Sequence, residues 1–221
     1  MPTKPGVLLF LAIFGVTALH AGTAVDLTTL GGTYVGGEYT LGFEFSPVVS
    51  IAVNSLGVFD STQGPLSSDA MVGIWDTSGD LLTSATVPSG TCATLVGYFC
   101  YVSITPFDLT AGTDYVVGSY LDALGTGLDT DEGGSGSFDP AISVVQDRYA
   151  EESTFQYPSI TDDFSGGAWL GANFQFSTQS TPEPGAFVLV AGGLAGLLAW
   201  RLRRSVRGEE RGQTATAFRI P

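Results

Sequence analysis

Acidic side chains are the main candidate functional groups of this chain, and they are densest in one Gly-rich stretch. Asp129, Asp131 and Glu132 lie close together there, with Asp122 before them and Asp139 after them. Carboxylate oxygens on a flexible loop suit Ca²⁺, which takes about six to eight oxygen ligands. The third ligand and the closing Glu of an EF-hand loop are absent, however. Two interpretations stay open: a calcium site at Asp129, Asp131 and Glu132, or a solvated acidic loop that binds no metal.

Most other catalytic chemistry is excluded by composition. The single histidine, His20, and the single lysine, Lys4, both lie within the first 20 residues, so the ectodomain has neither once an N-terminal signal peptide is cleaved. Ser-His-Asp and Cys-His systems need an imidazole base, a Ser-Lys dyad needs a lysine, and two cysteines cannot build a thiolate metal site alone. A glycosidase needs only two carboxylates, but nothing distinguishes one pair here, so this is our third hypothesis. We expect no catalytic activity and no cofactor other than that calcium.

The charge is distributed very unevenly. Between residues 25 and 184 one cation, Arg148, stands against 20 acids, a net charge of -19. Nucleic acid is excluded as a partner, because phosphate binding needs clustered Lys and Arg. We expect Arg148 to pair with a neighbouring acid rather than to bind an anion.

Aromatic side chains are a second candidate for binding, since an exposed flat ring can stack on a sugar. Trp169 follows two glycines at the start of an expected strand, and both a ligand-binding role and core packing fit that position. Trp75 lies in an alternating apolar segment, so we expect it to be packed in the interior. Exopolysaccharide is therefore a candidate partner.

Cys92 and Cys100 are the only cysteines. An even number of cysteines favours a disulfide if the chain reaches an oxidising compartment. Closing so short a loop stabilises the fold by about 2.5 kcal/mol on the chain-entropy model.

Short β-strands must position all of these residues. Period-2 alternation bounded by Gly, Pro, Asn and Asp recurs along the middle of the chain, and no segment shows a useful 3.6-residue period. Asp76 to Asp80 is expected to form a hairpin loop, with Gly79 at positive φ. We predict an all-β, jelly-roll-like sandwich, with strands near residues 39–45, 48–59, 71–76, 81–87, 99–105, 114–121, 142–146 and 169–177.

The N-terminal residues 1–24 are typical of a secretory signal peptide. Lys4 precedes an apolar run from Gly6 to Leu19, and Ala21 or Ala24 offers a small residue for cleavage. Fourteen apolar residues are short for a bilayer span, which needs about 20. We therefore expect cleavage rather than a permanent anchor.

The C-terminal segment combines three features in a fixed order. A Pro-Glu-Pro triplet precedes an apolar run that we predict to be a single transmembrane helix, and an Arg cluster follows as a stop-transfer signal. This arrangement resembles the PEP-CTERM sorting tail of Gram-negative bacteria. The resemblance implies cleavage near the triplet by an exosortase, a membrane-embedded transpeptidase. The matching residues are Pro182, Glu183, Pro184, the run Ala186 to Trp200, Arg201, Arg203 and Arg204.

The resulting organisation has four parts: a signal peptide (1–24), an acidic ectodomain (25–179), the sorting tail (180–204) and a short cytoplasmic tail (205–221). That last part departs from the family, whose tails usually stop soon after the Arg cluster. Residues 38–178 also resemble a bacterial surface domain of unknown function that often accompanies this tail.

We therefore expect an exported protein that is anchored transiently in the inner membrane and then delivered to the cell surface or extracellular matrix. It would act as a carbohydrate- or partner-binding module. The alternative is a structural acidic protein of the envelope or matrix without a small ligand.

Overall fold

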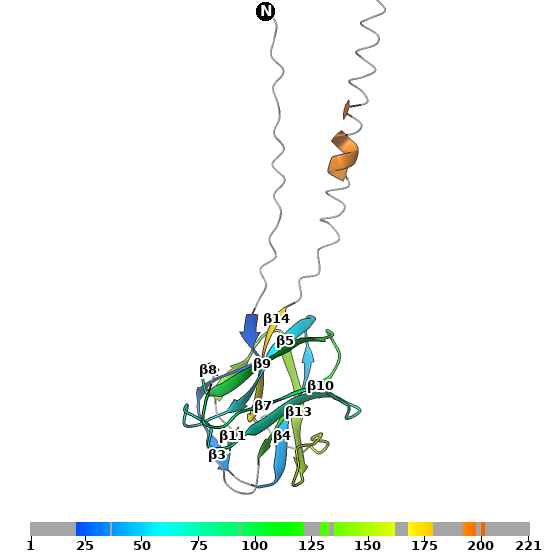
Figure 1. The fold of residues 1–221 in the computed structure, drawn as a ribbon. Helices are drawn as coiled ribbons and strands as arrows, with labels where there is room; N and C mark the ends of the chain where they lie inside the picture. Colours follow the sequence, from blue (N-terminus) through cyan, green and yellow to red (C-terminus); the bar gives the residue numbers. More distant parts are fainter. Residues whose placement is uncertain are drawn as a thin grey trace, which may run out of the picture. The chain divides into compact units, whose positions relative to one another are not determined.

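A computed structural model describes most of the expected ectodomain and a small part of the C-terminal segment (Figure 1). The chain divides into two compact units, Met1–Gln179 and Ser180–Pro221. The described residues are 21–35, 37–92, 94–121, 129–132, 135–161, 168–178, 192–197 and 200–201.

Strands dominate the described part of the first unit, so the all-β prediction is confirmed. In chain order they are β1 (Ala21–Thr23), β2 (Val25–Thr29), β3 (Gly32–Val35), β4 (Tyr39–Pro47), β5 (Ile51–Phe59), β6 (Ala70–Asp76), β7 (Leu81–Val87), β8 (Thr94–Val96), β9 (Phe99–Leu109), β10 (Tyr115–Leu121), β11 (Asp129–Glu132), β12 (Ser135–Phe138), β13 (Ile142–Glu151) and β14 (Ala172–Thr178).

Two five-stranded antiparallel sheets carry the fold. We call the first the N-sheet, with strand order β1-β14-β5-β9-β8, and the second the C-sheet, with order β13-β4-β10-β6-β7. Two small ribbons, β11 with β3 and β12 with β2, complete the pairing. Only β6 with β7 and β8 with β9 are consecutive in the sequence. The other neighbours in the two sheets come from distant parts of the sequence, so the complete sheets form only when the whole domain folds.

The hydrophobic core joins the two sheets. Phe45 of the C-sheet contacts Phe174 of the N-sheet with ring centroids 4.9 Å apart, and both side chains are fully buried. Tyr101 lies over Gly57, where an added Cβ would come within 2.5 Å of its ring. The Tyr101 hydroxyl is buried without a hydrogen-bond partner among the described residues, and this burial raises its pKa above the ordinary tyrosine value.

All eight predicted strands are present, and the errors concern short elements. β1, β2, β3, β8, β11 and β12 were not expected, since segments of three to five residues are too short to show a clear alternation. The expected loop at Asp129 to Glu132 is wrong: these residues form strand β11, with Asp131 opposite Thr33 of β3. The Thr-Tyr-Val sequence of β3 favours an extended strand. Its pairing with β11 joins segments that are distant in the sequence, so no local pattern predicts it.

The hairpin turn between β6 and β7 is confirmed. Asp76 Oδ1 accepts hydrogen bonds from the backbone N–H of Ser78 at 2.9 Å and of Asp80 at 3.0 Å, and Gly79 adopts φ +96°. The Ser78 hydroxyl and the backbone N–H groups stabilise the carboxylate, so they hold the pKa of Asp76 below its usual value.

Candidate functional site

Residues 152–161, which we call the strap, cross the C-sheet on the side away from the core. Gly118 of β10 lies directly opposite both Gly42 of β4 and Gly73 of β6, so three glycines stand side by side on adjacent strands. A Cβ added to Gly73 would lie 2.9 Å from the ring of Phe155, and one on Gly118 would lie 3.3 Å from the ring of Pro158. The glycine row therefore provides the space that the strap occupies.

Trp75 is covered by this strap. Its side chain is 3% exposed, and its ring centroid lies 4.9 Å from that of Phe155 and 6.3 Å from that of Tyr157. The Tyr157 hydroxyl donates a hydrogen bond to the carbonyl oxygen of Thr77, and burial raises the pKa of this hydroxyl. The prediction that Trp75 is packed in the interior is confirmed, although it is buried by the strap outside the sheet pair. Its ring is therefore not available to stack on a sugar.

Arg148 ties the strap to the sheet. Its guanidinium pairs with Glu44 of β4, with the Nε–H donating to Oε2 at 2.9 Å, and Nη1 donates to the carbonyl oxygen of Ser159. Gln146 donates to the same Glu44 oxygen at 2.6 Å. The Arg148 and Glu44 side chains are only 15% and 7% exposed. The expected pairing of Arg148 with an acid is confirmed, and the sequence alone did not identify Glu44 as its partner.

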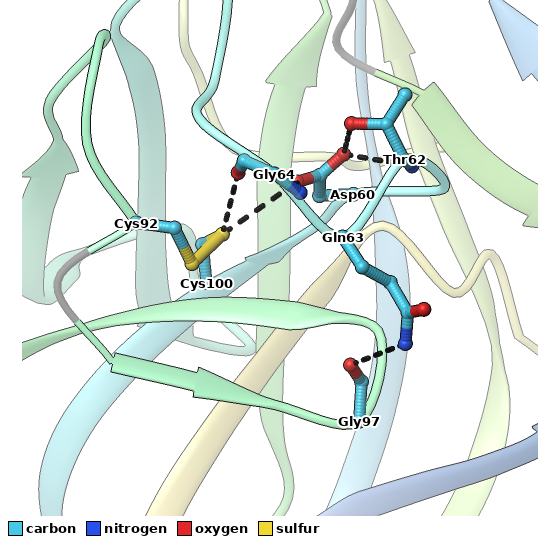
Figure 2. The surroundings of a disulfide bond; sticks show 7 residues. All are labelled: Asp60, Thr62, Gln63, Gly64, Cys92, Gly97 and Cys100. Carbon is cyan, nitrogen blue, oxygen red and sulfur yellow. Dashed lines mark hydrogen bonds between the residues drawn. A yellow bond between two sulfur atoms is a disulfide. The ribbon is translucent and has the colours of Figure 1, made fainter.

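A disulfide joins Cys92 and Cys100, as expected, with the Cα atoms 5.3 Å apart (Figure 2). Cys100 is fully buried, and its sulfur lies 3.8 Å from a carboxylate oxygen of Asp60. The bond therefore ties β9 to the segment before β8, beside the loop that follows β5.

Asp60 organises that loop. Its Oδ1 accepts hydrogen bonds from the N–H and the hydroxyl of Thr62, and its Oδ2 accepts one from the N–H of Gly64. Gln63 between them adopts φ +53° and donates its side-chain N–H to the carbonyl oxygen of Gly97 (Figure 2). Asp60 is 2% exposed, so this carboxylate is used for folding. An Asp followed by Thr at the second position and Gly at the fourth is a typical turn signal that the sequence analysis missed.

The proposed calcium ligands lie on β11, and the structure describes their backbone only. Among the residues that the structure describes, no group of three or more His, Cys, Asp or Glu side chains is arranged to hold a metal ion. The calcium hypothesis for Asp129, Asp131 and Glu132 stays a prediction.

Trp169 is half-buried and packs against the hydrophobic core. Its backbone N–H donates to the carbonyl oxygen of Gly42 at 3.2 Å, so the segment before β14 is fixed to β4. A ligand-binding role for Trp169 stays a prediction.

A shallow depression of about 450 Å³ lies where β1 meets β14. It is lined by neutral residues, without aromatic rings other than Phe176 and without carboxylates: Ala21, Gly22, Thr23, Asn54, Gln175 and Phe176. An open depression with this lining has no groups for acid-base chemistry.

Most of the predicted sorting tail falls outside the described residues. This applies to Pro182, Glu183, Pro184, Arg203 and Arg204, and to the signal peptide up to His20. The described parts of the predicted membrane helix, residues 192–197 and Trp200, are helical, as is Arg201 after it. Within the described residues, no helix has the length and apolar character needed to cross a membrane.

Comparisons with known proteins bear on two of the four expected parts, the ectodomain and the sorting tail. Residues 180–204 match the PEP-CTERM protein-sorting motif, which marks an exported protein that is sorted by an exosortase at the membrane. Residues 31–178 match a domain of unknown function, DUF4082. A comparison with curated proteins returns no match. Because the DUF4082 model covers more than half of the sequence, this chain belongs to the DUF4082 family and carries a PEP-CTERM sorting tail.

Proposed function

We propose that this protein is a non-catalytic, acidic structural protein of the cell surface or extracellular matrix. An N-terminal signal peptide directs its export, and exosortase removes its tail near Pro182 to Pro184. The ectodomain then acts as a soluble spacer whose charge keeps it apart from other polyanions.

This proposal rests on the pairing of the single cation, Arg148, with an acid. Between residues 25 and 184 the sequence has 20 acids and only Arg148, and the structure buries Arg148 in an ion pair with Glu44. The acids that remain at the surface therefore have no exposed Lys or Arg to neutralise them. A surface of this kind repels further copies of itself and anionic polysaccharide, which favours solubility over tight association.

The use of aromatic and acidic side chains in folding also supports a structural role. Trp75 is covered by Phe155 and Tyr157, and Asp60 is bonded within its own loop. A carbohydrate site could use a ring such as Trp75, and a catalytic pair could use a carboxylate such as Asp60. Both of these side chains stabilise the fold instead, and this observation favours a spacer over a binding module.

We also infer a jelly-roll topology. The strands β1-β14-β5-β9 of the N-sheet and β4-β10-β6-β7 of the C-sheet have the order of an eight-stranded jelly roll. β13 is then an extra strand beside β4. Jelly rolls serve both capsids and lectins, so this topology does not choose between the two roles.

Light scattering by the mature protein tests the electrostatic part of the proposal. At 10 mM salt, where the Debye length is about 30 Å, we expect a strongly positive second virial coefficient. At 1 M salt, where it is about 3 Å, the coefficient should fall towards that of a neutral particle. A negative coefficient at low salt would show attraction between copies and contradict the proposal.

Co-sedimentation with the producing bacterium's exopolysaccharide tests the binding alternative. We expect no saturable binding in calcium or in EDTA, and no release of reducing ends. Binding that is lost in EDTA would refute the spacer role in favour of a calcium-dependent module. In that event the variant Asp129→Asn/Asp131→Asn/Glu132→Gln should abolish it. A matched variant that removes equal charge elsewhere, Asp80→Asn/Asp114→Asn/Glu152→Gln, should retain it.

A further inference from the structure

The two sulfurs of the disulfide lie in different surroundings. Cys100 on β9 is completely buried, whereas Cys92 before β8 is partly exposed. The Cys100 sulfur lies 3.8 Å from a carboxylate oxygen of Asp60 and 3.8 Å from the carbonyl oxygen of Gly64 (Figure 2). A sulfur within a disulfide carries no hydrogen, so only the free thiol of Cys100 can donate to these oxygens. The bond is therefore asymmetric in both exposure and charge.

Asp60 is held beside Cys100 as a carboxylate. Thr62 donates its backbone N–H at 2.9 Å and its hydroxyl at 2.6 Å to one carboxylate oxygen. The N–H of Gly64 donates to the other oxygen at 2.8 Å. Hydrogen bonds to an ionised carboxylate are charge-assisted and strong. The negative charge is therefore fixed next to the buried sulfur.

The loop that carries this carboxylate is fastened to the turn between β8 and β9. The backbone N–H of Asp60 donates to the carbonyl oxygen of Tyr98 at 2.8 Å. The side chain of Gln63 donates to the carbonyl oxygen of Gly97 at 3.0 Å. Both acceptors come just before Cys100 in the sequence, so the carboxylate and the sulfur stay together in the folded protein.

Reduction by a thiol can begin at either sulfur, and the other cysteine then leaves as a thiolate. Attack at Cys100 requires an anionic thiolate to reach a fully buried sulfur that lies against the Asp60 carboxylate. Attack at Cys92 meets a partly exposed residue, but it expels the Cys100 thiolate into a buried site next to that carboxylate. Burial and a neighbouring like charge both disfavour the thiolate. Both routes are therefore slow, for different reasons.

We propose that Asp60 protects the Cys92–Cys100 bond against reduction by thiols, and that the reduction which does occur begins at Cys92. An external thiolate forms a new S–S bond to Cys92, and Cys100 leaves with the electron pair of the old bond and takes a proton from water. A second thiolate attacks the sulfur of the first reagent and releases Cys92, which is protonated in turn. Both cysteines are then reduced, and two thiol molecules are oxidised to one disulfide.

The product of a single exchange tests which sulfur is attacked. The folded exported protein is treated with 2-mercaptoethanol at increasing concentration until an adduct forms. Free thiols are then blocked with iodoacetamide, and the modified peptides are identified by mass spectrometry. We expect the mercaptoethanol adduct on Cys92 and the blocking group on Cys100, in at least about tenfold excess over the reverse pattern. A smaller excess, or the reverse pattern, would overturn the inference.

Rates of reduction by dithiothreitol at neutral pH test the role of the charge. Asp60→Asn removes the charge with little change of shape, and we expect its reduction to be at least about tenfold faster than that of wild type. Asp26→Asn is the matched control, because Asp26 is an exposed acid close to Gly97 of the same hairpin. Water and salt screen an exposed charge, so the rate of this control should stay within about twofold of wild type.

A second control separates the charge from closure of the loop. Thr62→Val removes the hydroxyl that donates to Asp60 but keeps the carboxylate, so its rate should also stay close to that of wild type. An equal acceleration in Thr62→Val and Asp60→Asn would show that loop closure protects the bond, and an unchanged rate in Asp60→Asn would show that Asp60 does not. Either result would overturn the inference. The adduct experiment needs no variant, so it tests the inference even if Asp60→Asn does not fold.

Discussion

Replacing Arg148 with Met separates the contribution of the buried ion pair from that of the surrounding packing. The guanidinium contacts Glu44 and the carbonyl oxygen of Ser159. Methionine fills part of the same volume without a charge. The Glu44 carboxylate, 7% exposed, would keep only neutral donors such as Gln146.

The expected cost follows from that burial. Removing one partner of a buried pair destabilises a protein by about 3–5 kcal/mol, because the remaining charge is uncompensated. A domain of this size has a total stability of about 5–15 kcal/mol, and each kcal/mol shifts its Tm by about 2–4 °C. We therefore expect Arg148→Met to lower the Tm by about 10 °C. The double variant Glu44→Gln/Arg148→Met removes both charges and should recover about half of the loss or more.

Unfolding in guanidinium chloride, followed by tryptophan fluorescence, measures the stability of both variants. Trp75 is a suitable probe because it lies under the strap that Arg148 holds. Arg148→Lys is the matched control. It keeps the charge but cannot donate from two guanidinium nitrogens to Glu44, so its stability should lie between those of wild type and Arg148→Met. Two results would refute the reasoning. One is a loss below about 1 kcal/mol in Arg148→Met, the range of exposed pairs. The other is a double variant no more stable than the single one.

Three further changes test other parts of the fold. Gly42→Ala should prevent stable folding, because the added Cβ would lie 1.8 Å from a carbonyl oxygen of β10. Gly64→Ala is the control: the nearest atom to its Cβ is 3.5 Å away. This control should keep the wild-type Tm in differential scanning fluorimetry. Cys92→Ser/Cys100→Ser should lower the free energy of unfolding by about 2.5 kcal/mol in denaturant titration, and an unchanged value would show that the short loop does not constrain the unfolded chain. The folded pKa of Asp76 is depressed, so its stabilisation is present above its unfolded value and is lost as pH falls through the folded one. Asp76→Asn should therefore flatten the decline of Tm between about pH 5 and pH 2, and an equally steep decline would argue against this contribution.

Local sequence patterns were sufficient for the eight longer strands, the turn between β6 and β7 and the sorting tail. A seven-residue alternation such as β6, or an Asp-Thr-Ser-Gly turn, reflects contacts within a few residues. The same holds for the Pro-Glu-Pro triplet before an apolar run with arginines after it, because the sorting machinery acts on this linear order.

The uses of individual side chains depended on long-range contacts. Glu44 and Arg148 are 104 residues apart, and their pairing requires β4 and β13 to become neighbours. In the sequence Trp75 looked like an ordinary core residue, and only the folded strap shows which face it occupies.

The sequence by itself therefore determined where this protein is sent, its β class and the sign of its charge. Tertiary structure decided which acids are used in folding, such as Asp60 and Glu44, and that the single cation between residues 25 and 184 is paired with one of them. The physical reason is the sequence separation of the residues involved: sorting signals and strand alternation are local properties of the chain. Burial and ion pairing arise only when segments that are distant in sequence exclude water from the same place.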